Sequence, residues 1–279
     1  MNNQLKKNMV NVFKYVLLLV FLVSTLFPFY WLFITSLKTK MEIHQLVPTF
    51  FPKLPTLQNY INMIKVTHFD VYIKNSLIVT MTSSVLVLVI SLMGGYALAR
   101  YKFKGKGFVF IFLICSQMIP MITAIIPMFI MYSKIGIINK PIALILSYTV
   151  SNVPFCLITA STFYSEIPVT LEEAAMIDGC SRFEAVRRII LPTMLPGVVA
   201  VFVFGFTGAW NELFYAVMMI SSESRRTIPS GLMNFVQKYD IDWGQMSAAG
   251  MVTLIPVMIM FFTVQKYIVS GLTSGAVKE

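Results

Sequence analysis

Six apolar stretches, each about 20 residues long, alternate with short polar segments along the chain. They lie near residues 14–34, 75–99, 108–132, 142–164, 198–220 and 247–268. A helix of about 20 residues crosses about 30 Å of hydrocarbon, and backbone in lipid must satisfy its hydrogen bonds within helices. The pattern predicts an all-α polytopic membrane protein with six spans. It also predicts a single transmembrane domain over residues 1–279, with no room for a soluble domain.

Composition supports this class. Hydrophobic residues make up 57% of the chain and charged residues 12%, and the mean hydropathy is +0.77. The first span follows Lys6, Lys7 and Lys14, but its apolar run is too long for a secretory signal and lacks a small-residue cleavage site. We expect this span to be retained. The three cysteines, Cys115, Cys156 and Cys180, are expected to be packing residues.

The basic residues predict the orientation of the spans. With the N-terminus inside, cytoplasmic segments hold twelve Lys and Arg against ten outside, which is nearly neutral. Short loops decide topology more strongly than bulk tallies. The loop between the second and third spans carries four cations within seven residues, Arg100, Lys102, Lys104 and Lys106. We therefore expect a cell-membrane protein with both termini and this basic loop in the cytoplasm.

The net charge of +10 raises the question of nucleic-acid binding. The basic residues flank the spans, and no basic surface interleaved with aromatic residues is present to receive a strand. Anchoring at anionic lipid headgroups accounts for these cations, so no nucleic-acid partner is predicted.

The segment 165–197, here called the acidic loop, is the main polar interruption between two spans. It contains five of the twelve acidic residues of the chain, which are Glu166, Glu172, Glu173, Asp178 and Glu184. A short folded polar segment in a mostly apolar chain indicates a docking site for a soluble partner.

Local signals predict two short helices in the acidic loop. Thr170 with Glu173, and Ser181 with Glu184, have the spacing of capping boxes. Gly179 provides a C-terminal stop between them, and the second helix should run toward Pro192. Helical spacing places Leu171, Ala174 and Ala175 on one face, where small alanines allow close approach. Phe183, Val186 and Ile190 share a face of the second helix in the same way.

These residues resemble the EAA motif of ABC-importer permeases. The matching positions are Glu173-Ala174-Ala175, Gly179, Ile189 and Leu191-Pro192. The resemblance extends to ALARYKFKGKG at 97–107, Trp210-Asn211-Glu212 and GLTSGAVKE at 271–279. Together they are similar to the second permease subunit of carbohydrate-uptake importers of the maltose and multiple-sugar type.

The resemblance implies a type I permease fold whose EAA loop is a coupling helix seated on a cytoplasmic ATPase. It implies three kinds of partner: a homologous second permease, an ATP-binding cassette ATPase dimer, and an extracytoplasmic solute-binding protein. The expected ATPase-coupling residues are Leu171, Glu173, Ala174, Ala175, Asp178, Gly179 and Phe183. A capping role alone for Glu173 stays open, and so does the choice between ATPase contact and disorder for the C-terminal tail.

The sequence predicts a non-catalytic subunit. It has no G-x-x-x-x-G-K-[ST] loop, H-E-x-x-H or G-x-S-x-G arrangement, its two histidines lie in the first outer loop, and no aspartate lies in a span. No catalytic residue, cofactor or metal is predicted. ATP hydrolysis is assigned to the partner ATPase, and an unknown kind of membrane enzyme stays as a remote alternative.

The runner-up hypothesis is an ion-coupled secondary transporter. Such proteins carry ionisable relay residues within their spans, and Glu212 is the one candidate. Its alternative role is to hold neighbouring helices through hydrogen bonds. Polar and aromatic residues of the spans are candidates for the sugar pathway, with helix packing as the alternative for each. They are Gln117, Tyr148, Asn152, Trp210, Asn211 and Glu212.

The outer segments 35–74 and 221–246 are expected to receive the solute-binding protein. The three prolines Pro48, Pro52 and Pro55 favour extended backbone in the first of them. The sugar stays open among maltodextrins, raffinose-type or isomaltose-type oligosaccharides, other glycans and glycerol-phosphate compounds.

Overall fold

The structure is a computed structural model that describes residues 3–236 and 241–276, with side chains from residue 7 to residue 267 outside the gap. Within these ranges the regular elements are helices, and the only β pairing is an isolated bridge between Val236 and Ile241. The all-α prediction is confirmed. Residues 237–240 of the second outer segment, and the last three residues of the expected tail, lie outside the described residues.

The chain divides into two compact units, each described here by itself. The first unit comprises Met1–Phe69 with Asn234–Leu254, and the second comprises Asp70–Met233 with Ile255–Glu279.

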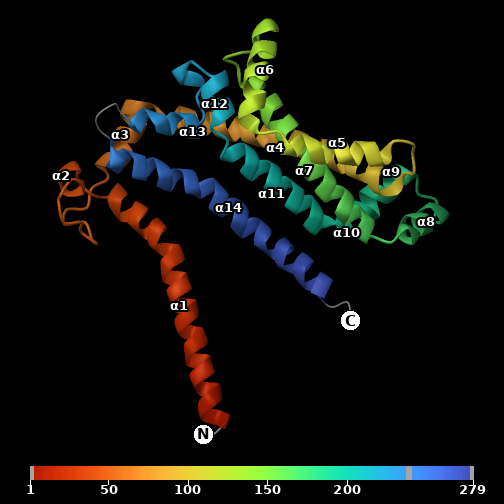
Figure 1. The fold of residues 1–279 in the computed structure, drawn as a ribbon, viewed down its shortest axis with the longest axis horizontal. Coiled ribbons are helices and arrows are strands. Elements are labelled where there is room, and N and C mark those ends of the chain that lie inside the picture. Colours follow the sequence, from red (N-terminus) through yellow and green to blue (C-terminus); the bar gives the residue numbers. More distant parts are fainter. Residues whose placement is uncertain (1–2, 237–240, 277–279) are drawn as a thin grey trace. The chain divides into compact units, whose positions relative to one another are not determined.

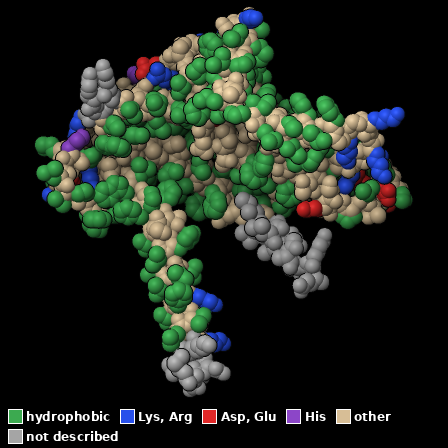
Figure 2. All heavy atoms as spheres, in the orientation of Figure 1, with side chains coloured by type: hydrophobic (Ala, Val, Ile, Leu, Met, Phe, Trp, Pro, Cys, Tyr) green, Lys and Arg blue, Asp and Glu red, His purple; other side chains and the backbone are tan. Residues whose placement is uncertain are grey.

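The first unit is built on α1 (Asn3–Ser36), α2 (Lys40–Ile43), α3 (Gln58–Thr67) and the beginning of α14 (Trp243–Ala276). The side chains of α1 are mostly apolar and exposed, with Leu17 53% and Phe21 69% exposed. Figure 2 shows hydrophobic side chains along the surface of α1. Such a surface is suited to lipid or to other helices.

The segment between α1 and α3 is organised by one carboxylate. Glu42 accepts a hydrogen bond from the Thr49 hydroxyl at 2.6 Å and from the Lys53 backbone N–H at 3.0 and 3.2 Å. Lys38 donates to the Thr49 carbonyl and lies over the Trp31 ring, 4.7 Å from its centroid. These bonds fold the proline-rich part back onto α2.

The second unit contains the remaining elements (Figure 1). In chain order these are α4 (Phe69–Arg100), α5 (Lys106–Met118), α6 (Met121–Lys134), α7 (Pro141–Glu166), α8 (Val169–Ile177), α9 (Arg182–Ala185), the π-helical turn η1 (Val186–Ile190), α10 (Leu191–Thr193), α11 (Leu195–Trp210), α12 (Phe214–Met219), η2 (Glu223–Arg225), α13 (Ile228–Leu232) and, at the boundary, η3 (Met233–Phe235). Helix α7 packs against both α11 and α5.

Glycines allow the long helices of this unit to approach closely. A Cβ on Gly95 of α4 would lie 2.7 Å from the Ala160 Cβ and 2.9 Å from the Ser161 backbone nitrogen of α7. A Cβ on Gly197 of α11 would lie 2.5 Å from the Phe163 ring. Small residues at helix crossings are the usual basis of close packing in membranes, so α4, α7 and α11 form one tightly packed layer.

Four helices of the described residues are long and apolar enough to cross a membrane. They are Lys7–Ser36, Phe69–Arg100, Pro141–Glu166 and Trp243–Tyr267. The number becomes six if two bent pairs each count as one span: Lys106–Met118 with Met121–Lys134, bent by 98°, and Arg182–Thr193 with Leu195–Trp210, bent by 80°.

Two expected spans therefore differ from straight helices. The stretch 108–132 breaks between α5 and α6, where Ile119 is extended and Pro120 follows. Proline lacks a backbone donor and disfavours helix in the residue before it. The stretch 198–220 also breaks, because α11 ends at Trp210 and α12 begins at Phe214.

Candidate functional site

The acidic loop folds as a helix, a tight turn and a second helix. Helix α8 ends at Ile177, and Gly179 follows with φ of +91°, a conformation that favours glycine. The Gly179 N–H donates to the Met176 carbonyl at 3.1 Å, and the Cys180 N–H donates to the Ala175 carbonyl at 3.0 Å. This pair of bonds is a Schellman motif, which confirms Gly179 as the stop signal.

Of the two predicted capping boxes, one is confirmed and one is wrong. Ser181 accepts from the Glu184 N–H at 3.3 Å, and the Glu184 carboxylate accepts from the Ser181 N–H at 3.0 Å. Thr170 does not cap α8, because the helix already begins at Val169 after Pro168. The fixed φ of proline suits a helix start, and this places Thr170 inside the first turn.

The hydrogen bonds at Ser181 also act on the charge of Glu184. The backbone N–H and the hydroxyl of Ser181, together with the nearby Arg188 guanidinium, lower the pKa of the Glu184 carboxyl. Since the Glu184–Arg188 ion pair is mostly exposed, it contributes little to stability.

The faces of the acidic loop are divided differently from the helical-spacing prediction. Ala175 is buried, with 3% of its surface exposed, because it packs inward beside Glu172 on α8. The remaining predicted coupling residues present an outward surface. They are Leu171, Glu173, Ala174, Asp178, Gly179 and Phe183, all of them exposed. On the second helix Phe183 is 73% exposed whereas Ile190 is fully buried.

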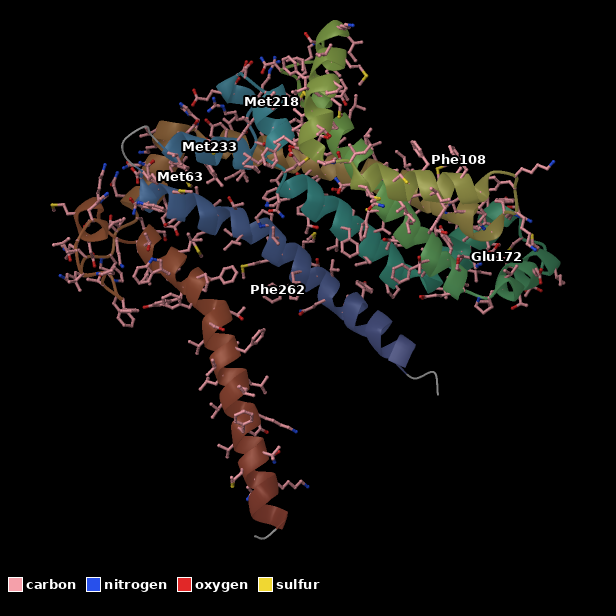
Figure 3. The ribbon with its side chains drawn as sticks, viewed as in Figure 1. Met63, Phe108, Glu172, Met218, Met233 and Phe262 are labelled. Atoms are coloured by element: carbon pink, nitrogen blue, oxygen red, sulfur yellow. The ribbon has the colours of Figure 1, made fainter. Side chains whose placement is uncertain are left out.

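Sequence analysis missed the residue that anchors the acidic loop. The Glu172 carboxylate pairs with the Arg100 guanidinium at 2.5 Å, and each side chain is only 6% exposed. The Tyr96 hydroxyl donates to Glu172 at 3.0 Å, and Arg100 also donates to the Ile167 carbonyl at 2.9 Å. Glu172 is labelled in Figure 3 at the end of the second unit where α8 lies. Its neighbour Glu173 carried the motif match, and nothing in the local spacing distinguishes the buried carboxylate.

A second contact joins the basic loop to the acidic loop. Arg182 donates to the Tyr101 hydroxyl at 3.1 Å, and its guanidinium lies 5.4 Å from the centroid of that ring. Figure 2 shows acidic and basic side chains gathered over the same end of the unit, around α8 and α9. The two loops therefore lie together at the end of α4 and α7 (Figure 1).

A cavity of about 690 Å³ lies at the break between α5 and α6. Of the predicted pathway residues, Gln117 lines it. Three polar residues that sequence analysis did not select also line it, Ser116, Ser151 and Tyr215. The Ser151 hydroxyl donates to the Tyr215 hydroxyl at 3.4 Å. Ser151 is adjacent to the selected Asn152, and the break at Ile119-Pro120 was the available signal for a cavity here.

Three other predicted pathway residues, Tyr148, Asn152 and Trp210, lie in packed positions. Tyr148 and Trp210 are 1% and 2% exposed, Trp210 stacks on Phe206 with centroids 5.5 Å apart, and its indole N–H has no hydrogen-bond partner within the described residues. Asn152 donates to the Tyr148 carbonyl at 2.8 Å within α7.

Asn211 and Glu212 lie at the break after α11. Asn211 is exposed and donates to the Thr207 carbonyl at 3.0 Å. The Glu212 carboxylate accepts from the Tyr215 N–H at 3.0 and 3.1 Å and from the Ala216 N–H at 3.3 Å. Glu212 therefore holds the first turn of α12, and its carboxylate is satisfied by backbone donors.

Residues 91–274 match the family model of the binding-protein-dependent transport system inner membrane component. The chain belongs to this family. The matched region includes the acidic loop, both helix breaks and the cavity, and the family together with the apolar helices makes the chain a multi-pass membrane protein.

Curated relatives match over nearly the whole chain. The diacetylchitobiose uptake system permease protein DasC of Streptomyces coelicolor is 38% identical over 93% of this chain and 94% of its own length. The sulfoquinovosyl glycerol transport system permease protein SmoH of Agrobacterium fabrum is 36% identical over 93% and 91%. The trehalose/maltose transport system permease protein MalG of Thermococcus litoralis is 34% identical over 91% of each.

Solved structures confirm the fold. A chain of a bacterial ABC transporter involved in the import of the acidic polysaccharide alginate superimposes with a TM-score of 0.81 at 19% identity, covering 94% of this chain and 98% of that one. A chain of the MetNI methionine ABC transporter in inward-facing conformation gives a TM-score of 0.57 at 22% identity, over 70% and 92%. The predicted type I importer permease fold is borne out.

Proposed function

We propose that this protein is a permease subunit of an ATP-driven, binding-protein-dependent carbohydrate importer, in which it forms half of the translocation pathway. The observation that carries the proposal is the outward surface of the acidic loop, held on a packed helical layer and matching the EAA motif. Its partners are a homologous second permease, a cytoplasmic ATPase dimer and an extracytoplasmic binding protein. The chain itself hydrolyses no ATP, and the partner ATPase supplies the energy.

The contact between the two loops supports a cytoplasmic position for the acidic loop. Short basic loops favour the cytoplasmic side, and Arg100 at the start of the basic loop pairs with Glu172 of the acidic loop. If the basic loop is cytoplasmic, the acidic loop is too. The outward residues of α8 then face the compartment that contains the ATPase.

The relatives support a glycoside as the substrate. Three of them are named as transporters of diacetylchitobiose, sulfoquinovosyl glycerol and trehalose/maltose, which are all glycosides. The cavity at the α5–α6 break offers hydroxyl and amide groups from Ser116, Gln117, Ser151 and Tyr215 among apolar side chains. A few polar groups in an otherwise apolar cleft suit the orientation of a polyhydroxylated ligand. We propose a di- or oligosaccharide that passes along this cavity.

Copurification and uptake test the assignment. The protein, tagged at its C-terminus in native membranes, should copurify with an ATPase, a second permease and a binding protein. Sugar uptake should cease on ATP depletion and persist with proton and sodium ionophores. Uptake that survives ATP depletion and collapses with ionophores would instead establish the ion-coupled transporter, with Glu212 as the first residue to test.

A substitution on the outward surface tests the coupling role of the acidic loop. Ala174 is exposed on α8, so Ala174→Trp should leave the loop folded while it blocks close approach of the ATPase. We expect the variant to retain the second permease but to lose the ATPase on purification. Ala174→Ser keeps a small side chain and is the matched control. Normal recovery of the ATPase with Ala174→Trp would refute coupling through this surface.

A further inference from the structure

Helix α4 ends in a polar cluster that is hydrogen-bonded to the acidic loop at two points. Arg100 is the last residue of α4, and its guanidinium donates both to the Glu172 carboxylate on α8 and to the Ile167 carbonyl just before α8. Tyr96, one turn earlier in α4, donates to the second carboxylate oxygen of Glu172. We call these three residues, Tyr96, Arg100 and Glu172, the α4 link.

The α4 link is shielded from water, unlike the Glu184–Arg188 ion pair of the same loop. Both side chains of the Arg100–Glu172 pair are 6% exposed, whereas those of the Glu184–Arg188 pair are 41% and 68% exposed. Charges that are buried together hold a defined geometry, because separating them would leave each one without solvent or a partner. The link is therefore a stiff connection, and the exposed pair is not.

The α4 link also contacts α7 and an apolar cluster that reaches the far end of the acidic loop. The Tyr96 ring lies edge-on to Tyr164 of α7, with centroids 5.4 Å apart. Tyr164 is buried in an apolar cluster with Ile190 and Met194, which lie at the far end of the acidic loop. One turn of α4 thus contacts α7, Glu172 near the start of the loop and the apolar cluster near its end, so a displacement of α8 acts on all of them.

Helix α8 presents two chemically different faces. Glu172 and Ala175 are turned inward and buried, and Glu173 and Ala174 are exposed. An external partner that pushes on the exposed face must move the buried face with it, since both belong to one short helix. The buried face is attached to α4 by the ion pair.

We propose that the α4 link transmits displacement of the acidic loop to α4, and so converts ATPase movement into movement of the membrane helices. Tyr96, Arg100 and Glu172 are positioning residues in this account, because they act through α8 and α4 and not on the sugar. The inference rests on the proposed function, which supplies the ATPase that moves the loop. Long-range coupling requires physical contacts that pass displacement from one element to the next, and the link is such a contact between α8 and α4.

The test compares sugar transported per ATP hydrolysed in the complete reconstituted importer. The informative variant is the double substitution Arg100→Gln with Glu172→Gln, which removes both charges together and leaves no unpaired buried charge. We expect the complex to assemble and hydrolyse ATP, with a transport-to-hydrolysis ratio lower by about 2- to 30-fold. A merely structural role would reduce the yield of the complex and leave the ratio unchanged.

A matched control removes the same charges from neighbouring exposed positions. Lys102 lies in the basic loop and Glu166 at the end of α7, and both are exposed. Lys102→Gln with Glu166→Gln should keep the wild-type ratio. An equal fall in both double variants would overturn the proposal, because it would trace the effect to charge and not to the link.

The remaining outcomes of the experiment also test the proposal. If the double variant does not assemble, Arg100→Lys keeps the charge but not the two-point contact, and an unchanged ratio in that variant would overturn the proposal. An unchanged ratio in an assembled Arg100→Gln, Glu172→Gln complex would do the same. A wild-type chain that recruits no ATPase would instead refute the proposed function, so the two failures are distinguishable.

Discussion

Two glutamates of this protein are equally buried and serve opposite purposes. Glu42 in the segment after α1 and Glu172 in the acidic loop are each 5% exposed, and they are the buried carboxylates of the described residues. Glu42 accepts from Thr49 and from the Lys53 backbone, both within eleven residues of it. Glu172 pairs with Arg100, 72 residues away on another helix.

The difference shows that a buried glutamate can either stabilise its own loop or join its loop to a distant helix. The bonds of Glu42 return to its own segment, so they stabilise a local fold that neighbouring helices do not need. The bonds of Glu172 cross to α4, and the order of the acidic loop becomes inseparable from the position of that helix. Substitutions at the two sites should therefore differ in how much stability they remove and in how far from the site the structure is disturbed.

The largest effect is expected at Glu172. Glu172→Ala leaves the Arg100 guanidinium buried without its carboxylate, and breaking a buried pair from one side costs about 3–5 kcal/mol. Thermal unfolding of the purified protein in nanodiscs should report a loss of this size. Adding Arg100→Met should recover much of it, since the unpaired charge is then gone. A Glu172→Ala protein as stable as the wild type would contradict the claim that Glu172, unlike Glu42, joins its loop to a distant helix.

The close crossing beside the α4 link should give the next largest effect. A Cβ on Gly95 meets α7 backbone at 2.9 Å, so Gly95→Val must push α4 from α7, at a cost of about 1–3 kcal/mol. Gly107 of α5 has nothing within 4 Å of the same position. Gly107→Val is the matched control and should be neutral or stabilising in the same unfolding assay. Equal tolerance at both glycines would show that the α4–α7 contact is not tight.

The sequence predicted the elements whose signals are local. Apolar runs predicted the long helices, and Ser181 with Gly179 predicted the turn between α8 and α9, because capping groups act within a few residues. Thr170 had the same spacing but lost its role to Pro168, which starts the helix earlier. The motif match located the acidic loop and its family.

The features that escaped prediction depend on distant partners. Nothing near Glu172 in the sequence indicates Arg100, since their contact depends on how α4 and α7 pack. The inward position of Ala175 and the presence of serines in the cavity also depend on helix packing, so the sequence did not predict them. Pro120 marked a kink but not its angle of 98°, because the angle follows from the packing on each side of the break.

A smaller and more local effect is expected at Glu42. Glu42→Gln keeps an oxygen acceptor but loses its charge, which weakens the bond to the Lys53 N–H by about 1 kcal/mol. Hydrogen exchange at the Lys53 amide should accelerate about fivefold at that cost, with global unfolding nearly unchanged. Thr49→Val is the control, because it removes the hydroxyl donor and leaves the Lys53 bond. A large fall in global stability would contradict the local character of this site.

The smallest effect is a loosening of the same segment at low pH. The Thr49 hydroxyl, and then the Lys53 N–H and the nearby lysines, hold the pKa of Glu42 below its ordinary value of 4.5 although burial opposes them. A carboxyl with a lowered pKa in the folded state stabilises fully above its ordinary pKa, and the contribution is lost as pH falls through the folded value. Pepsin, which is active in acid, should therefore cleave within residues 38–57 faster as pH falls below 4.5. The comparison is with Glu42→Gln, which has no carboxyl to titrate. The wild-type cleavage rate should start below that of this variant and rise toward it as the pH falls. A difference between the two proteins that stays constant through this window would show that Glu42 is not the group whose protonation opens the segment.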